Sequence, residues 1–418
     1  MAKTPVRRPP MGWNSWDCFG TTVTEAEVLA NAEFMAAHLL EFGWDTVVVD
    51  IDWYDPAARA HGYNDGTSLV VDAFGRQLPA ENRFPSAAGG RGFGPLADAV
   101  HALGLRFGVH LMRGIPRIAV DADLHVEGTA WTARDAADTT SVCPWNEDNY
   151  GLDHDHPAAQ AYLDGLVAQL AGWGVDFLKV DDMLAPYHPD AVEAWARAIE
   201  RSGRDIVLSL SPGTHLSTAH VDHLREHAQM WRISDDLWDR WEDVHAQFAR
   251  LARWAPFQRP GGWADADMLP LGRLALGERR TRFTPDEQRT MMSLWAIARS
   301  PLIMGGDLRA LDAETLALLT NDAIIAVDQH SRDGRQLYRT DRHIAWTARD
   351  TRSHDSYVAL FNLGEAADEV SVDLAAAGAG SAANVTDLWE GTPLGHHRTH
   401  FSARLPAHGA GLFRLARA

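Results

Sequence analysis

Acidic residues stand where short apolar runs of this sequence end, and one of them comes with a lysine. The run Phe177-Leu-Lys-Val-Asp places Lys179 two residues before Asp181. Side chains at positions i and i+2 share one face of a strand, so the ammonium and the carboxylate are expected to project together. A nearby positive charge keeps a carboxylate ionised, which is the state that a nucleophile requires. Asp181 is therefore a candidate nucleophile.

A second acid, Asp236, follows the segment Trp-Arg-Ile-Ser-Asp on an expected loop. A carboxyl group that solvent can reach is able to release a proton in one step and recover it in the next. Glycoside hydrolysis needs two such groups, because one attacks the anomeric carbon and the other protonates the leaving oxygen. The pair Asp181 and Asp236 therefore predicts glycoside hydrolysis, and Arg232 is placed to bind a sugar hydroxyl or to tune the acid.

Other polar or aromatic side chains lie at or just after the ends of further apolar runs. They are Trp16, Asp50, Asp52, His110, Ser211, Asp265 and Asp267. Any one of these acids, taken alone, could equally be a helix cap or a loop anchor. Trp16, taken alone, could equally be part of the core. A metal-dependent hydrolase would place several histidines at strand ends, whereas only His110 of the 20 histidines clearly lies at one. We therefore expect no metal and no cofactor.

These candidates require elements that bring distant strand ends to one place. Through about residue 325 the sequence alternates β-rich runs with helical segments. The run at residues 46–52 is apolar and ends in acids, as does a parallel strand that is covered on both faces. Residues 24–27, Thr-Glu-Ala-Glu, form a capping box at the start of a helical pattern. This alternation predicts an α/β fold, the (β/α)₈ TIM barrel, whose functional side chains lie at the carboxyl ends of the strands.

Two segments depart from the alternation. Residues 113–156 form a long connection that contains Trp145. Long loops are usually functional or disordered, and the aromatic residues of this one indicate an ordered cover over the barrel mouth. From about residue 327, short alternating runs separated by Gly and Asp predict a small antiparallel β-sandwich. The predicted domains are the catalytic barrel at residues 1–327 and the β domain at residues 328–418.

Composition restricts the partners. The net charge of −19 argues against nucleic acid and anionic membranes and fits a neutral substrate such as a carbohydrate. The basic N-terminus has no apolar core, and the longest apolar runs are shorter than the ~18 residues that a membrane span needs. We therefore expect no signal peptide, no membrane partner and a cytoplasmic location. Self-association into a homo-oligomer is left open.

Four segments carry motifs that occur together in one enzyme family. They are Pro9-Pro-Met-Gly-Trp-Asn-Ser-Trp16, Phe177-Leu-Lys-Val-Asp181, Gly261-Gly-Trp-Ala-Asp-Ala-Asp-Met-Leu269 and Trp295-Ala-Ile-Ala-Arg-Ser-Pro-Leu-Ile303. Over residues 9–330 the chain resembles glycoside hydrolase family 27, the family of α-galactosidases and α-N-acetylgalactosaminidases. The resemblance implies eight strand–helix units, a second β domain and a retaining exo-glycosidase, with Asp181 as nucleophile and Asp236 as acid/base. The expected substrate-binding residues are Trp16, Asp50, Asp52, His110, Trp145, Lys179, Ser211, Arg232 and Asp267.

Several positions depart from the family pattern. The second acid of the family's aspartate pair falls on Ile51, although Asp52 shares a strand face with Asp50. The strand-three tyrosine of the family is His110. The strand-five glutamate is Ser211, which resembles the branch that accepts a 2-acetamido group. The start of residues 113–156 resembles an outlying subgroup, of bacterial type, that includes β-L-arabinopyranosidases, whose sugar is galactose-like without its C6 group.

Three classes of function follow from these residues. The first is a glycosidase for terminal α-galactose, with β-L-arabinopyranoside and α-N-acetylgalactosaminide as alternatives. The second is a sugar-binding protein that has lost catalysis, which Lys179, Asp181 and Asp236 disfavour because a lectin needs no nucleophile. The third is a metal-dependent barrel hydrolase, which the strand ends do not support.

Overall fold

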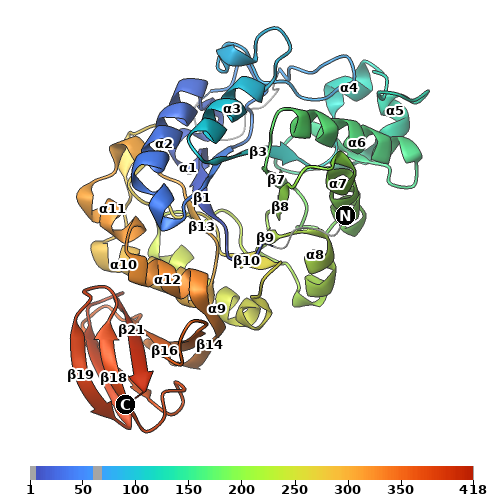
Figure 1. Cartoon of the computed structure of the whole chain (residues 1–418). Helices are drawn as coiled ribbons and strands as arrows, with labels where there is room; N and C mark the ends of the chain where they lie inside the picture. Colours follow the sequence, from blue (N-terminus) through green and yellow to red (C-terminus); the bar gives the residue numbers. More distant parts are fainter. Residues whose placement is uncertain (1–5, 60–67, 418) are drawn as a thin grey trace.

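Eight parallel strands form one closed sheet in the computed structural model, which describes residues 6–59 and 68–417. Their order is β10-β9-β8-β7-β3-β2-β1-β13. Their bounds are β1 (Met11–Asn14), β2 (Thr46–Val49), β3 (Arg106–Met112), β7 (Phe177–Asp181), β8 (Val207–Leu210), β9 (Met230–Arg232), β10 (Trp263–Asp265) and β13 (Leu302–Met304). Leu269, just after β10, pairs with Met304 of β13 and closes the ring. The predicted (β/α)₈ barrel is confirmed (Figure 1).

Helices follow the strands and lie around the outside of the barrel (Figure 1). The longer ones are α2 (Glu25–His38), α3 (Gly94–Ala102), α6 (Pro157–Gly172), α7 (Pro189–Ser202), α8 (Val221–His227), α9 (Trp241–Trp254), α10 (Pro285–Ala298), α11 (Ala313–Leu319) and α12 (Asp322–His330). The capping box that opens α2 is confirmed, because the side chains of Thr24 and Glu27 each accept from the other's backbone N–H. All four residues of β2 are buried, since side chains fill the barrel on one face and helices cover the other.

The long connection at residues 113–156 is folded, as expected. It contains the three-stranded sheet of β4 (Ile115–Pro116), β6 (Asn149–Leu152) and β5 (Ala137–Val142), with the short helices α4 (Arg117–Asp121) and α5 (Ala133–Ala136). The Asn149 amide donates to the Arg113 carbonyl at 3.1 Å, which ties this sheet to the end of β3. The connection is thereby held at the carboxyl end of the barrel strands.

The chain ends in an antiparallel β domain. One sheet has the order β14-β15-β16-β21-β18-β19 and the other pairs β17 with β20. The bounds are β14 (Ser331–Arg339), β15 (His343–Asp350), β16 (Ser356–Asn362), β17 (Asp368–Asp373), β18 (Ala382–Asp387), β19 (Pro393–Arg398), β20 (His400–Leu405) and β21 (Ala410–Arg417). Val358, Val372 and Phe413 belong to the buried cluster between the sheets. The sandwich is confirmed, while the domain division at residues 327 and 328, which falls within α12, stays a prediction.

The β domain is joined to the barrel through α10 (Figure 1). The Thr290 hydroxyl donates to the His408 carbonyl at 2.5 Å, and the Trp389 indole donates to the Ser293 hydroxyl at 2.9 Å. The rings of Trp241 and His408 stack with their centroids 4.0 Å apart. Polar and aromatic contacts therefore fix the two domains to each other.

None of the helices in residues 6–59 and 68–417 combines the length and the apolar character that crossing a membrane requires. The expectation of no signal peptide depends partly on residues 1–5, which lie outside the described residues.

Candidate active site

Asp181, the last residue of β7, is hydrogen-bonded on both carboxylate oxygens. His110 Nε2, from β3, lies 2.7 Å from Oδ2, and the Ser211 hydroxyl, just after β8, donates to Oδ1. The three strand ends meet because β7 pairs with β3 on one side and with β8 on the other. His110 is fully buried and Asp181 nearly so. The pairing of the barrel strands thus places the side chains of His110 and Ser211 within hydrogen-bonding distance of the Asp181 carboxylate.

Lys179 pairs directly with Asp50 rather than with Asp181. Its Nζ lies 2.8 Å from Asp50 Oδ2, and the Asn14 amide donates to the same oxygen at 2.6 Å. The backbone N–H of Asp50 donates in turn to the Ser15 hydroxyl at 2.9 Å. These contacts fix the end of β2 against the end of β1, with the ammonium between β2 and β7.

Arg232, at the end of β9, joins two further acids. Its guanidinium lies 2.8 Å from Asp267 Oδ1 and 3.3 Å from Asp236 Oδ1. The Leu237 N–H donates to the other oxygen of Asp267 at 2.6 Å, which fixes the loop that carries Asp236. The Asp236 side chain is 37% exposed, whereas those of Arg232 and Asp267 are buried. Asp236 is therefore the more accessible acid, as the sequence predicts.

Charge keeps Asp181 ionised despite its burial. Burial alone would raise the pKa of Asp181, but the Lys179 ammonium and the hydrogen bonds from His110 and Ser211 lower it below the ordinary value. Burial would likewise lower the pKa of Lys179, but Asp50, Asp181 and Asp236 together raise it. The expectation that Lys179 keeps Asp181 charged therefore agrees with the electrostatics of the site.

The acids near Arg232 behave differently. Burial raises the pKa of Asp267 and raises the pKa of Asp265 to about 6, while the positive charge of Arg232 opposes both shifts. Arg232 itself has its pKa raised by Asp267 and Asp236, against the effect of its burial. A buried arginine with two acidic neighbours keeps its positive charge, so it can hold Asp236 in place and bind an oxygen of a ligand.

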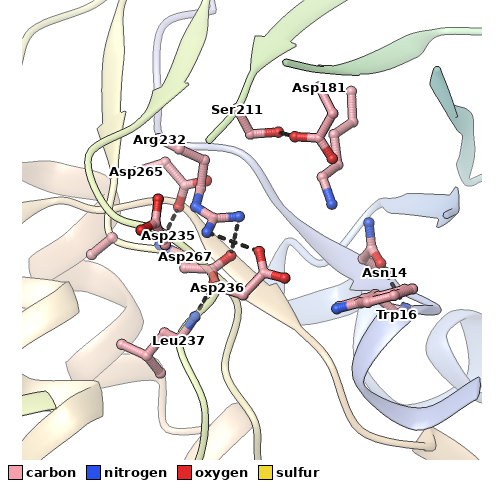
Figure 2. Close-up of polar contacts among 12 residues, drawn as sticks. Asn14, Trp16, Asp181, Ser211, Arg232, Asp235, Asp236, Leu237, Asp265 and Asp267 are labelled. Carbon is pink, nitrogen blue, oxygen red and sulfur yellow. Dashed lines mark hydrogen bonds and ion pairs between the residues drawn. The ribbon is translucent and has the colours of Figure 1, made fainter. Parts of the chain in front are cut away.

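Aromatic and apolar side chains complete the surroundings. Figure 2 shows Asp181, Asp236 and the indole ring of Trp16 around the same space, with Arg232 directed toward Asp236. Trp16, Ile51 and Met112 belong to one buried apolar cluster, against which Trp145 of the long connection packs. The connection therefore contributes an aromatic side chain next to the predicted pocket wall.

Asp52 has different neighbours from the other predicted site residues. It is fully buried, it lies in the left-handed backbone region with φ of 66°, and its carbonyl accepts from Arg83. Its charge acts on Arg83 and Tyr54. The structure thus brings together Trp16, Asp50, His110, Trp145, Lys179, Asp181, Ser211, Arg232, Asp236 and Asp267, and it places Asp52 with Arg83.

Two further residues, Asn14 and Asp17, contribute to the site but are not predicted from the sequence. Asn14 lies within one of the family motifs, but the sequence does not reveal its hydrogen bond to Asp50, because the two residues are 36 positions apart. Asp17 is buried, and its pKa is raised by burial and by the charges of Asp267 and Asp236. Gly305 approaches it so closely that a Cβ there would lie 1.9 Å from the carboxylate. The sequence feature that could have identified Asp17 as a site residue is its position directly after Trp16.

Comparisons with known proteins agree with this geometry. Residues 150–330 match the family model described as alpha galactosidase A, and residues 340–415 match that of the alpha galactosidase C-terminal beta sandwich domain. The structure of a β-L-arabinopyranosidase of glycoside hydrolase family 27 from Geobacillus stearothermophilus is 48% identical, with a TM-score of 0.96 over 99% of this chain and 97% of that one.

More distant relatives extend the same comparison. Alpha-galactosidase 2 of Arabidopsis thaliana is 26% identical over 98% of this chain and 89% of its own length. The α-N-acetylgalactosaminidase of Gallus gallus is 29% identical over 81% of this chain and 75% of its own length. The barrel, the sandwich and the acid-lined mouth define a glycoside hydrolase, whose substrate is a carbohydrate. The chain belongs to glycoside hydrolase family 27.

Proposed function

We propose that this enzyme is a retaining exo-glycosidase that releases a terminal galactose-like sugar, and that its preferred substrates are β-L-arabinopyranosides. Two carboxyl groups with different surroundings support the first part, since Asp181 is buried and charged while Asp236 is partly exposed. One apolar residue, Ile51, supports the second. The sequence alone predicts a galactose-like sugar, and the proposal selects the one pentose among the alternatives, β-L-arabinopyranose.

In the first step, Asp181 attacks the anomeric carbon while Asp236 gives its proton to the leaving aglycone oxygen, so that a glycosyl ester forms as the glycosidic bond breaks. The hydrogen bonds from His110 and Ser211 orient the attacking carboxylate. In the second step, Asp236 removes a proton from water, which displaces Asp181 and returns the sugar with its original configuration. Retention requires the two carboxyl groups to lie about 5–5.5 Å apart.

The sugar preference depends on the side chain that faces the C5 position of the pyranose. By the family resemblance, Ile51 replaces an acid that would bind the 6-hydroxyl, and Asp50 stays to bind the 4-hydroxyl. Ile51 is 1% exposed and belongs to the same apolar cluster as Trp16 and Met112. Burying a hydroxyl against such a wall without a partner costs about 1–3 kcal/mol. A pentose that lacks C6 avoids this cost, and the relative from Geobacillus stearothermophilus acts on that sugar by its description.

The test is a panel of nitrophenyl glycosides that compares β-L-arabinopyranoside, α-galactoside and α-N-acetylgalactosaminide. We expect the highest kcat/KM for β-L-arabinopyranoside. A higher kcat/KM for α-galactoside would contradict the preference while leaving the glycosidase intact. Fastest hydrolysis of α-N-acetylgalactosaminide would instead make Ser211 the residue that sets specificity.

A further inference from the structure

A mixed cluster of histidine and carboxylate lies on the outer helices, away from the predicted sugar site. Glu193 of α7 and His223 and His227 of α8 each offer one atom that could bind a metal ion, and these three atoms lie within 4.8 Å of one another. His223 and His227 are four residues apart on a helix, so their rings lie on the same face. The rings are adjacent, with centroids 4.6 Å apart.

The distance between two of the three side chains matches a tetrahedral metal centre. His223 Nε2 lies 3.3 Å from Glu193 Oε1. Zinc binds imidazole nitrogen and carboxylate oxygen at about 2.0–2.2 Å, so two ligand atoms at the tetrahedral angle lie roughly 3.3–3.5 Å apart. Glu193 and His223 therefore already stand at ligand spacing. The two side chains are 38% and 25% exposed, which lets an ion and a water molecule reach them.

Outer partners hold two of the three side chains in this orientation. The Tyr187 hydroxyl lies 2.5 Å from His223 Nδ1, and Arg197 donates to the second oxygen of Glu193 at 3.2 Å. Histidines that bind metals almost always use the other ring nitrogen in a hydrogen bond, which fixes the ring and its tautomer. The Tyr187 ring is itself fixed by stacking on His220 at a centroid distance of 4.0 Å.

We propose that Glu193, His223 and His227 bind one divalent transition-metal ion, with zinc the best fit, and that water fills the fourth position. Two imidazoles and one carboxylate suit zinc better than magnesium or calcium, which prefer oxygen ligands. The bound ion would cross-link α7 to α8, the helices that follow β7 and β8. This metal is structural and takes no part in sugar hydrolysis, so the proposal stands independently of the proposed function.

The experiment uses the full chain without an affinity tag, after treatment with a chelator and exchange into metal-free buffer. Zinc chloride is titrated by isothermal titration calorimetry, and the unfolding temperature is measured with and without zinc. We expect one zinc ion per chain and a higher unfolding temperature in its presence, because a ligand that binds the folded state stabilises it. His227→Ala should weaken binding by about tenfold or more and abolish the temperature gain, since it removes one of three protein ligands.

A matched control separates this site from histidine binding in general. His396 is exposed on β19 of the other domain, and His396→Ala should bind zinc as the native chain does. Glu193→Gln provides a second variant if His227→Ala fails to fold, and it should weaken binding as well. Unsaturable or absent zinc binding by the native chain would overturn the proposal. So would unchanged affinity in a folded His227→Ala or Glu193→Gln variant.

Discussion

Asp181 keeps its charge in a buried place because an ammonium and two hydrogen-bonding side chains surround it. Lys179 supplies the charge, while His110 and Ser211 supply the hydrogen bonds. The order of the strands explains this arrangement. Lys179 of β7 reaches past β3 to Asp50 at the end of β2, and Asp181 is hydrogen-bonded by His110 of β3 and by Ser211, just after β8. The carboxylate of Asp181, the proposed nucleophile, thus stays ionised through the charge of Lys179 at a distance and through hydrogen bonds from its other neighbours.

His110→Phe should lower kcat/KM by roughly 10²-fold, because removing one oriented donor to a reacting group has an effect of this size. The variant should also move the acidic limb of the pH profile of kcat/KM to higher pH. His110 lowers the pKa of Asp181, so its removal raises that pKa and more of the nucleophile is protonated at low pH. The measurement is kcat/KM across pH for the native enzyme, His110→Phe and His110→Gln.

His110→Gln is the matched control, since its amide N–H can still donate to Asp181. Partial recovery of rate and of the acidic limb would support the hydrogen-bonding role. An unchanged acidic limb in His110→Phe would contradict it and would leave His110 with a purely structural role.

Ile51→Asp should raise kcat/KM for α-galactoside relative to β-L-arabinopyranoside by about tenfold or more, since a hydrogen-bonding partner for a substrate hydroxyl alters discrimination on this scale. Ile51→Asn, of similar size and without charge, is the control for the polar contact. Equal losses on both substrates would show that residue 51 does not face C6.

Among the elements, the junction of β7 with its following loop depends on a buried ion pair. Arg113 Nη2 lies 2.7 Å from Asp182 Oδ2, and the two side chains are only 6% and 3% exposed. Arg113 also donates to the Ser141 hydroxyl at 3.0 Å, which connects β5 of the long connection to this junction. The same pair therefore fixes both Asp182, which follows the proposed nucleophile, and the long connection at residues 113–156.

Arg113→Met should lower the free energy of unfolding by about 3–5 kcal/mol, because it leaves Asp182 buried without its partner. Urea unfolding of Arg113→Met, Asp182→Asn and the double variant measures the effect and the coupling. The double variant should recover part of the loss, since no unpaired charge is left. A loss below about 1 kcal/mol in Arg113→Met would place the pair in the class of weak surface ion pairs.

The sequence predicts elements better than it predicts their contacts. The apolar run of β2 and the capping box of α2 are local patterns, so they are readable without a structure. The bond between Lys179 and Asp50 joins residues 129 positions apart, and only the order of strands brings them together. The sequence also does not predict the small sheet within residues 113–156, because β4 has only two residues and β5 is largely polar.

At the scale of the whole molecule, the barrel and the β domain pack against each other at an interface formed by α9 and α10. Glu287 Oε1 of α10 lies 2.8 Å from His408 Nδ1, beside the stacked rings of Trp241 and His408. Phe248 of α9 contacts Phe361 of β16 with ring centroids 4.9 Å apart. Contacts of this kind, buried and aromatic, couple the stability of the two domains.

Differential scanning calorimetry should therefore show one unfolding transition for the whole chain. Phe361→Ala should lower its temperature, because removing a buried phenylalanine costs about 3–5 kcal/mol. Val372→Ala is the control variant, because Val372 belongs to the buried cluster within the β domain and not to the interface with the barrel. Two separate transitions in the native chain, with only the upper or only the lower one shifted by Phe361→Ala, would show that the domains unfold independently.

Proton NMR during hydrolysis of nitrophenyl β-L-arabinopyranoside identifies the anomeric configuration of the sugar that the enzyme releases first, and so tests whether Asp181 is the nucleophile of a retaining enzyme. We expect β-L-arabinopyranose to appear first, because an ester between the sugar and Asp181 forms and is then hydrolysed by water. We also expect Asp181→Asn to release no sugar while it keeps the native unfolding temperature to within a few degrees. First release of the α anomer, or turnover by Asp181→Asn, would contradict the assignment of Asp181 as nucleophile.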